Sequence, residues 1–444
     1  MKKKLIIFLI ALSQLKLISA QEVLVLKVDS LFALVERNSK QLDLSRYRSQ
    51  MASNAVVIEK QKAYLPDLNT SFSYAYLSNG HVWDNDFKYE STVKVPHTSL
   101  DFSIEAGYTV FNGNMSKNRI AKAKLQEQIS ILNFQKDKED VQFLLLAKYL
   151  DLAALHNQEM IYQENIALAE KRLYNIGKLI EQGMLTHNDK VRSELQLNDI
   201  RQKLSEIRNN IAIVNHDMNV VLGLSPETSI QIDSLFLLKD LSVNKNVTEF
   251  GFTNRLPELK AAAIQSTIAE KEVNISKAGH LPSVSLFAGD VVSRPFLNAM
   301  PPVDIYLHLF QTGVKIKYDI GSIYKGKNLI HQAKMEQAFT RRNQDVLTEK
   351  AEMDIHAAYI KIQDAQQKYN SMCESYRLAK DNYGVVEQKY LNKFVTITDM
   401  LDASTSLLGA QINMNNAQIG IVYQYYYLLK TTGLWEEQVN GKNK

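Results

Sequence analysis

The chain has 444 residues but only 17 glycines and 8 prolines, so it offers few turn-forming positions and predicts long regular elements. It carries 52 basic and 48 acidic residues, and four of the lysines lie in the leader described below. The remainder is therefore neutral overall, which excludes the strongly basic surface of a nucleic-acid-binding protein. The single cysteine, Cys373, excludes an intramolecular disulfide.

Residues 1–20 have the layout of a secretory signal peptide. Three lysines precede the apolar stretch 5–12, and the small residue Ala20 marks the expected cleavage position. The alternative is a transmembrane anchor. It is disfavoured because Gln14 and Lys16 interrupt the apolar run, whereas a spanning helix needs about 20 apolar residues. We therefore expect an exported mature chain.

The rest of the chain repeats itself. Matching residues lie 210 positions apart, as in the pairs Tyr149 and Tyr359, Asp189 and Asp399, and Leu197 and Leu407. Such a gapless match over a long stretch indicates a tandem duplication. The expected divisions are a first repeat at 21–224, a linker or equatorial segment at 225–253, a second repeat at 254–434 and a C-terminal tail at 435–444.

Each repeat predicts the same order of elements. The first repeat predicts a lead-in helix at 31–63, strands at about 67–77 and 99–111, and helices at about 115–182 and 187–222. The second predicts a lead-in helix at 257–277, strands at about 283–293 and 305–319, and helices at about 326–392 and 397–432. From Leu197 to Val221 the apolar residues step alternately by three and four, which is the heptad pattern of a coiled coil.

The predicted strands alternate apolar and polar residues over about ten positions, as transmembrane β-strands do. In the segment from Leu100, apolar residues share one face, while Asp101 and Glu105 share the other. A soluble sandwich with one wet face is the alternative. The charged polar faces and the shortage of sheet favour a barrel with a watery lumen. Four strands cannot close a barrel, since about eight is the minimum, so three copies would have to share about twelve strands.

Three segments carry a resemblance to a known family: "FVTITDMLDASTSLLGAQ" at 394–411, "NRLPELKAA" at 254–262 and "LPDLNTSFSY" at 65–74. With the duplicated order of elements, they resemble the TolC-type outer-membrane efflux channels over essentially the whole mature chain. The resemblance implies a mainly α-helical homotrimer, with a small transmembrane β-barrel in the outer membrane and a helical tunnel across the periplasm. It also implies an inner-membrane pump and a periplasmic adaptor as partners, and no cofactor.

The same resemblance implies a gate at the periplasmic end of the tunnel. The candidate gate residues are Asp399, Asp402, Asp189, Tyr390 and Arg192. Asp399 and Asp402 are three apart, so they share one helix face, and a threefold axis would gather their carboxylates into a ring. Val395 stands where the family keeps a gate arginine. Arg192, at the repeat position of Asp402, is a candidate for the missing cation.

The turns between the long helices are small and apolar, which is typical of a surface that a partner covers. By resemblance we expect the adaptor to dock there. The residues concerned are Gly183, Met184, Leu185, Thr186, Lys393, Phe394, Val395 and Thr396.

Other classes of protein fit less well. The sequence has no GxxxxGK[ST] loop, no HExxH and no cysteine cluster, so an enzyme is not expected. Glu352 and His356 lie four apart rather than in the Glu-x-x-His pattern of di-iron helices, and a solvated helix face is expected there. The main alternative is a periplasmic coiled-coil adaptor, which also has long helical hairpins. Drugs, amphiphiles, metal ions and polypeptides all stay open as cargo.

Overall fold

The computed structural model describes residues 23–233, 255–299 and 301–440. The expected signal peptide and most of the expected linker at 225–253 lie outside these described residues.

The described chain forms two compact units from interleaved segments. We call Arg46–Asn133 and Glu258–Leu347 the sheet unit. The core unit comprises the chain up to Ser45, the segment Phe134–Pro257 and the chain from Thr348 onward.

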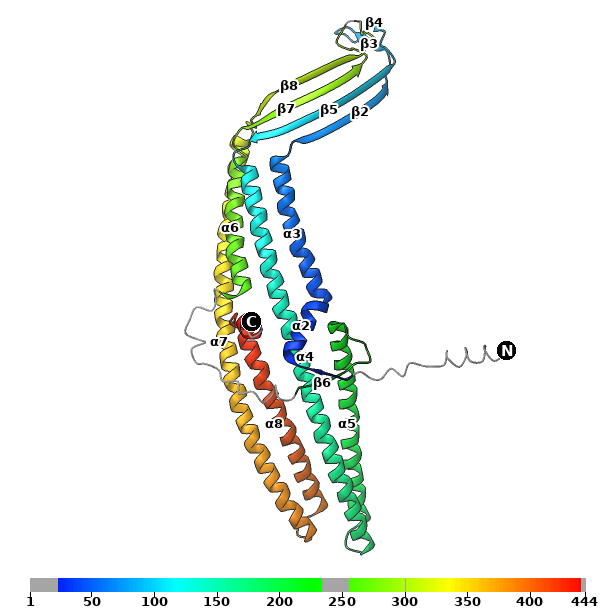
Figure 1. Cartoon of the computed structure of the whole chain (residues 1–444), viewed down its shortest axis with the longest axis vertical. Coiled ribbons are helices and arrows are strands. Elements are labelled where there is room, and N and C mark those ends of the chain that lie inside the picture. Colours follow the sequence, from blue (N-terminus) through cyan, green and yellow to red (C-terminus); the bar gives the residue numbers. More distant parts are fainter. Residues whose placement is uncertain (1–22, 234–254, 300, 441–444) are drawn as a thin grey trace, which may run out of the picture. The chain divides into compact units, whose positions relative to one another are not determined.

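The sheet unit holds a four-stranded antiparallel sheet in the order β2-β5-β7-β8 (Figure 1). Its strands are β2 (Asp67–Tyr76), β5 (Thr98–Phe111), β7 (Ser283–Arg294) and β8 (Leu307–Lys317). Each repeat supplies two neighbouring strands, as the duplication predicts, and β5 pairs with β7 across the repeats. Within the described residues, β2 and β8 each have one edge with no partner strand.

One face of this sheet is apolar and exposed, because the pairing register aligns the apolar positions of all four strands. Phe72, for example, lies opposite Phe102 and is 65% exposed. The exposed apolar side chains of this face are Leu68, Phe72, Tyr74, Phe102, Ile104, Leu286, Phe310, Val314 and Ile316. Asp290 and His308 interrupt this face, and Asp290 Oδ1 lies 2.6 Å from His308 Nε2.

The opposite face is polar, with Asp101, Glu105 and Lys315 among its side chains, as the alternation predicts. The weaker alternation of β7 places Phe287 on this face, directly opposite Gly313. A Cβ at Gly313 would lie 3.0 Å from the Phe287 ring, so the glycine makes room for that ring.

A short two-stranded ribbon, β3 (Gly80–Trp83) and β4 (Tyr89–Val93), lies in the connection between β2 and β5. This ribbon was not predicted from the sequence.

Helices precede and follow these strands along the chain. In the sheet unit, Lys122 of α4 (Met115–Glu181) and Glu272 of α6 (Pro257–Ala278) form an ion pair of 2.7 Å. The helix α7 (Ser322–Leu391) begins earlier than the expected 326 and, like α4, has residues in both units. None of the helices within the described ranges has an apolar stretch long enough to cross a membrane.

The expected single lead-in helix at 31–63 is wrong, because two helices occupy this segment: α2 (Val28–Asn38) and α3 (Lys40–Tyr64). Ser39 between them has extended backbone angles. At the break, Ser39 Oγ accepts the N–H of Leu42 at 3.4 Å, and Asn38 Nδ2 donates to the carbonyl of Leu222 at 2.7 Å. Local helix propensity carried no sign of the second contact.

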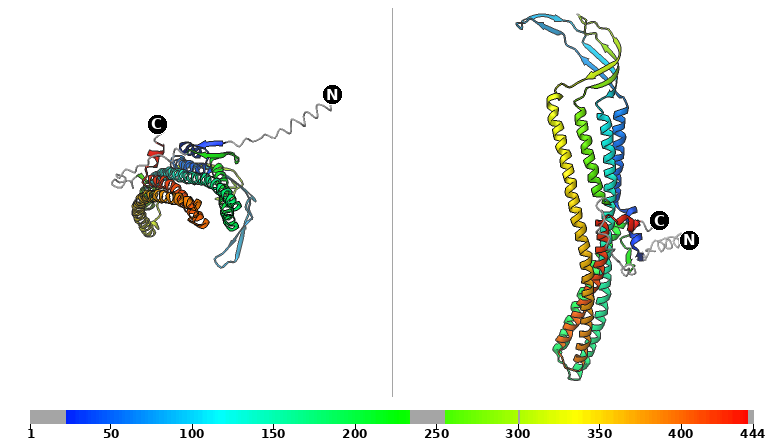
Figure 2. Two further views of the ribbon diagram at one scale, coloured as in Figure 1. Left: turned by 90° about the horizontal axis from the view of Figure 1, so that it is seen from below. Right: turned by 90° about the vertical axis from the view of Figure 1, so that its left-hand side faces the viewer.

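The core unit contains two helical hairpins, α4 with α5 (His187–Leu222) and α7 with α8 (Ile397–Thr431). The predicted heptad seam of α5 is confirmed for Leu197, Ile200, Leu204 and Ile207, which are all buried. Figure 2 shows α4 and α8 side by side, and Gln158 Nε2 donates to Asn416 Oδ1 at 3.2 Å between them.

A mixed cluster forms the main hydrophobic core of this unit. It joins α2, α4, α5 and α8 to a parallel strand pair, β1 (Val23–Leu26) and β6 (Ser229–Ile232). The fully buried Tyr149 donates its hydroxyl hydrogen to the carbonyl of Leu26 at 2.8 Å, and burial raises the pKa of this tyrosine to about 12.

The chain after α8 belongs to this core. Residues 435–444 were expected to be a tail, but Trp435 is fully buried. Its indole N–H donates to Gln142 Oε1 of α4 at 2.9 Å, which removes the cost of burying an unpaired donor.

Glu139, one turn before Gln142 on α4, is buried at 6% exposure. Burial raises its pKa to about 7, and Glu436 and Asp140 add smaller contributions of the same sign. The folded state therefore favours the protonated carboxyl. The stability that Glu139 contributes is fully present below about pH 4.5 and is lost as the pH rises through about 7.

We expect Glu139→Gln to stabilise the protein above pH 7, by at most about 3 kcal/mol, because the amide stays neutral while the carboxyl has to ionise. The measurement is the thermal unfolding midpoint at pH 5 and pH 8 in detergent. The midpoint of the parent should fall more between these pH values than that of the variant. Glu36→Gln, which removes an exposed partner of Lys138, is the control and should keep the parental pH dependence. An equal fall in Glu139→Gln would contradict this explanation.

Candidate functional site

The two helical hairpins end in the same turn, built twice. At the end of α4 the N–H groups of Gly183 and Met184 donate to the carbonyls of Ile180 and Leu179, both at 2.8 Å. At the end of α7 those of Lys393 and Phe394 donate to the carbonyls of Tyr390 and Lys389, at 3.0 and 2.8 Å. This is the Schellman pattern, which needs a left-handed residue just beyond the helix.

Gly183 has φ +69° and Lys393 has φ +65° at this left-handed position. Glycine adopts this conformation without cost, whereas a lysine is strained in it. The second repeat thus keeps the turn although a lysine replaces the glycine.

A threonine and an aspartate close the start of each returning helix. Thr186 donates its backbone N–H and its hydroxyl to Asp189 Oδ2, at 2.9 and 2.7 Å, and accepts the Asp189 N–H. Thr396 and Asp399 make the same contacts at 2.8 and 2.6 Å. Both pairs are complete capping boxes. The hydrogen bonds from Thr396 lower the pKa of Asp399.

The two aspartates of the predicted pair thus have different local roles. Both are exposed to solvent, but Asp399 is held by the capping box at the start of α8, whereas Asp402 lies one turn further along the helix. The geometry gives Asp189 and Asp399 a local structural role, which the sequence could have indicated through the spacing Thr-x-x-Asp.

Arg192, the candidate for the missing cation, links the two hairpins. Its Nη1 donates to Thr398 Oγ1 at 2.5 Å, which connects α5 to α8. Arg192 is exposed, so this contact is open to water.

A second arginine, Arg172 of α4, joins four helices and was not predicted. It donates to Gln196 Oε1 of α5 at 3.2 Å, to Tyr383 Oη of α7 at 3.3 Å and to Ser404 Oγ of α8 at 3.0 Å. Gln196 continues the network by donating to Thr405 Oγ1 at 3.1 Å. The repeat position of Arg172 is an asparagine, Asn382, so the duplication itself gave no signal for it.

Tyr390 lies in an apolar cluster between this network and the turns, together with Ile176, Ile397 and Met400. Its hydroxyl is buried and has no hydrogen-bond partner among the described residues. Burial raises the pKa of Tyr390, and the Asp189 carboxylate adds to the shift.

The tips of the hairpins present apolar side chains to solvent. Phe394 is 80% exposed and Met184, its repeat partner, is 46% exposed, while Leu185 and Val395 turn partly toward the apolar cluster. These are the residues expected at the docking surface.

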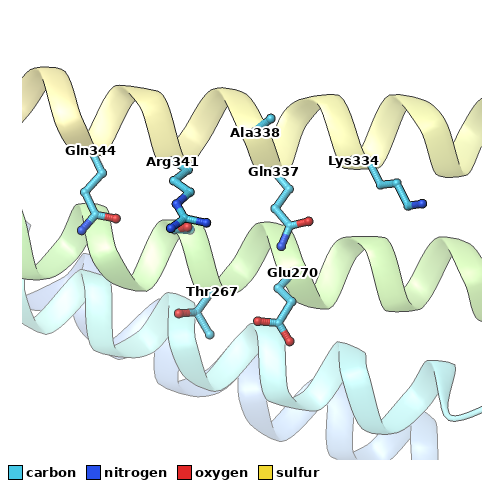
Figure 3. Close-up of a pocket in the computed structure, with 8 residues that line it drawn as sticks. Thr267, Glu270, Lys334, Gln337, Ala338, Arg341 and Gln344 are labelled. Carbon is cyan, nitrogen blue, oxygen red and sulfur yellow. The ribbon is translucent and has the colours of Figure 1, made fainter.

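The sheet unit has a groove between α6 and α7 (Figure 3). This open groove of about 440 Å³ has a polar lining that includes Glu270, Lys334 and Arg341. In Figure 3, Lys334 and Arg341 extend from α7, and Glu270 extends from α6. Within the described residues, no group of three or more His, Cys, Asp or Glu side chains could hold a metal ion.

No family model matches the chain. The outer membrane efflux protein BepC of Brucella suis is 21% identical over 401 residues, which cover 89% of this chain and 83% of BepC.

Solved structures are similar over nearly the whole length. The outer membrane protein VceC of Vibrio cholerae matches with a TM-score of 0.74 and 15% identity, over 91% of this chain and 96% of VceC. The outer-membrane channel OprN matches with 0.73 and 13%, over 91% and 89%. The CmeC outer membrane channel of Campylobacter jejuni matches with 0.71 and 14%, over 94% and 88%. The resemblance to TolC-like outer-membrane efflux channels is therefore confirmed, and this chain has their fold.

Proposed function

We propose that this protein is the outer-membrane exit duct of a tripartite efflux or type I secretion system. It is a passive conduit that spans the outer membrane and extends into the periplasm. The observation that carries this proposal is the four-stranded sheet, with an exposed aromatic face, a charged opposite face and two unpaired edges. The names of the similar proteins, an efflux protein and several outer-membrane channels, support the same function.

The unpaired edges of β2 and β8 explain why the proposed duct is a homotrimer. In hydrocarbon every backbone N–H and C=O needs a partner, so an open sheet edge is not stable there. Pairing β8 of one copy with β2 of the next removes both edges, and three copies supply about twelve strands, which suffices for a barrel.

Two helices carry exposed apolar stripes that fit the same assembly. On α3 the residues Leu44, Met51 and Ile58 recur every seven positions and are 54%, 71% and 40% exposed. On α7 the exposed stripe consists of Phe339, Val346, Met353 and Ile360, again seven apart. Heptad stripes of this kind bind other helices, so we assign them to contacts between copies.

The adaptor alternative accounts for the hairpins but not for the sheet. A soluble adaptor gains nothing from an exposed face of Phe72, Tyr74 and Phe310, because that face costs solubility in water. The two hypotheses differ in a fractionation experiment. A channel stays in the outer membrane after salt and carbonate washing, while an unanchored adaptor is released.

The proposed gate lies at the hairpin ends. Arg172 joins α4, α5, α7 and α8 by hydrogen bonds and so holds both hairpins of one copy together. Asp399 and Asp402 would repeat around a threefold axis, where unit charges about 6 Å apart repel by roughly 3 kcal/mol at an effective dielectric of 20. A ring of this kind attracts cations. The gate therefore combines a hydrogen-bonded lock within each copy, centred on Arg172, and a cation-selective ring between copies.

The proposed docking surface for the adaptor is the pair of tips at 183–186 and 393–396. The exposed Phe394 and Met184 supply apolar contact area, and the strong turn geometry presents them rigidly. The inner-membrane pump is reached through the adaptor. Nothing in this mechanism requires catalysis or a cofactor.

The first prediction from the proposed function concerns assembly. The purified protein should have the mass of three chains in detergent. Met51→Glu and Val346→Glu should each reduce the trimer fraction several-fold, because a carboxylate would be buried in the contact between copies. Met160→Glu, at a 56% exposed position of α4, is the matched control and should leave the trimer intact. A parent protein that inserts as a monomer would disprove barrel sharing.

The second prediction concerns the gate and is measured as single-channel conductance in lipid bilayers. Arg172→Gln should raise the resting conductance several-fold, because a neutral amide cannot satisfy Gln196, Tyr383 and Ser404 together. Asp402→Asn should weaken cation selectivity without changing the unfolding midpoint. Asp399→Ala should weaken selectivity and also lower the unfolding midpoint, because the capping box is lost. Parental selectivity in both aspartate variants would refute the ring.

The third prediction concerns docking. Phe394→Ser and Met184→Ser should each reduce export at least about tenfold while the trimer persists, since both remove apolar contact area. Export is measured as substrate accumulation in a deletion strain that carries the variant. Lys393→Gly is the control, because glycine keeps the left-handed turn and Phe394 remains in place. Normal export by the serine variants would count against docking at the tips.

A further inference from the structure

The ribbon β3–β4 is an ordered protrusion at one end of the sheet (Figure 1). Its base is closed where the Leu77 N–H donates to the carbonyl of His97 at 2.9 Å and His97 Nδ1 donates to the carbonyl of Leu77 at 2.8 Å. Asn79 Oδ1 accepts the N–H of Val95 at 3.3 Å. The ribbon is therefore a defined structural element with its own internal bonds.

The tip of the ribbon holds an aromatic side chain outward. One oxygen of Asp84 accepts the backbone N–H groups of Asp86 and Lys88, at 2.9 and 2.8 Å. Phe87 between them has φ +59° and is 88% exposed. A bulky residue in the left-handed region is strained, and exposing its ring to water costs further free energy. Strain of this kind marks candidate functional positions.

The outer face of the ribbon is aromatic as well. The His81 ring lies 6.0 Å from the Trp83 ring and 6.2 Å from the Tyr89 ring, tilted by 55° and 56°. Thr92 Oγ1 lies 2.5 Å from Tyr89 Oη and 3.4 Å from His81 Nδ1, which orients both rings. Trp83 and Tyr89 are 55% and 61% exposed. The face is thus preorganised and uncovered.

The charge of the ribbon is negative. Between residues 80 and 93 it carries the carboxylates Asp84, Asp86 and Glu90 against the single cation Lys88, with all four side chains exposed. Aromatic faces attract cations through their quadrupole, and nearby carboxylates add a Coulombic attraction of the same preference.

We propose that the aromatic face of this ribbon, together with the carboxylates elsewhere on the ribbon, binds a basic peptide segment of a partner protein, whose Arg or Lys side chains stack on Trp83, Tyr89 and Phe87. Charge complementarity selects this occupant. A phosphate-bearing lipid surface and a second copy of the ribbon both carry negative charge, so they would be repelled. The proposal stands on the ribbon alone and does not depend on the export function.

The experiment uses the full-length protein in detergent at low salt with fluorescently labelled hexa-arginine as the probe, read by anisotropy. The parent should bind, and Trp83→Ala/Tyr89→Ala should bind roughly tenfold more weakly, since two cation–π contacts are lost. Phe87→Ser is a milder variant that leaves the ribbon face intact and should weaken binding severalfold. Asp86→Asn/Glu90→Gln should also weaken binding and reduce its dependence on salt.

Tyr64→Ala is the matched control, because this tyrosine is 66% exposed on another element and should not affect the probe. Unfolding midpoints of all variants establish that the fold is kept. Equal binding by the parent and both aromatic variants would overturn the proposal, as would equal binding of hexa-glutamate. Binding to phosphatidylglycerol vesicles, or association of trimers that Trp83→Ala abolishes, would equally overturn it in favour of another occupant.

Discussion

The unsatisfied backbone groups at the outer edges of β2 and β8 are the constraint on which the proposed assembly depends. Each edge presents a row of N–H and C=O groups, and an apolar surround offers them no water. The apolar face of the same sheet makes such a surround the natural one, since its phenylalanines and tyrosines are largely exposed. In the proposed assembly, edge pairing between copies resolves the first problem, and lipid resolves the second.

The two hairpin ends illustrate how a duplication keeps geometry while chemistry diverges. Both keep the Schellman turn and the Thr-x-x-Asp capping box, because these satisfy backbone groups that every helix end leaves open. The side chains around them differ. Arg172, which lies in the first repeat, donates hydrogen bonds to three other helices, α5, α7 and α8. The matching position in the second repeat is not an arginine. The proposed lock is therefore asymmetric within one copy, although the scaffold beneath it is nearly symmetric.

Buried polar groups explain the shape of the core unit in a similar way. The Trp435 indole needs an acceptor, Gln142 supplies it, and the segment after α8 is thereby joined to α4 at Trp435. Asn38 and the Leu222 carbonyl are paired in the same way. The raised pKa of Glu139 belongs to the same region, where burial favours the neutral form of a carboxyl. Each bond joins segments far apart in sequence.

The sequence by itself determined the features that depend on local periodicity. The alternation of apolar and polar residues with a period of two located β2, β5, β7 and β8. Apolar residues spaced three and four apart located the buried seam of α5. Both patterns are informative because side-chain spacing follows directly from backbone geometry. The repeat itself revealed that both halves share one order of elements. The Thr-x-x-Asp spacing could also have indicated the capping boxes, since the partners in each box lie within one helical turn.

Only the tertiary structure decided which distant groups meet. The buried Trp435 and the four-helix contacts of Arg172 depend on partners that no local pattern contains. Asp399 and Asp402 are both exposed, yet a capping box holds only Asp399. The physical reason is that a polar side chain takes its role from the donors and acceptors that folding places around it.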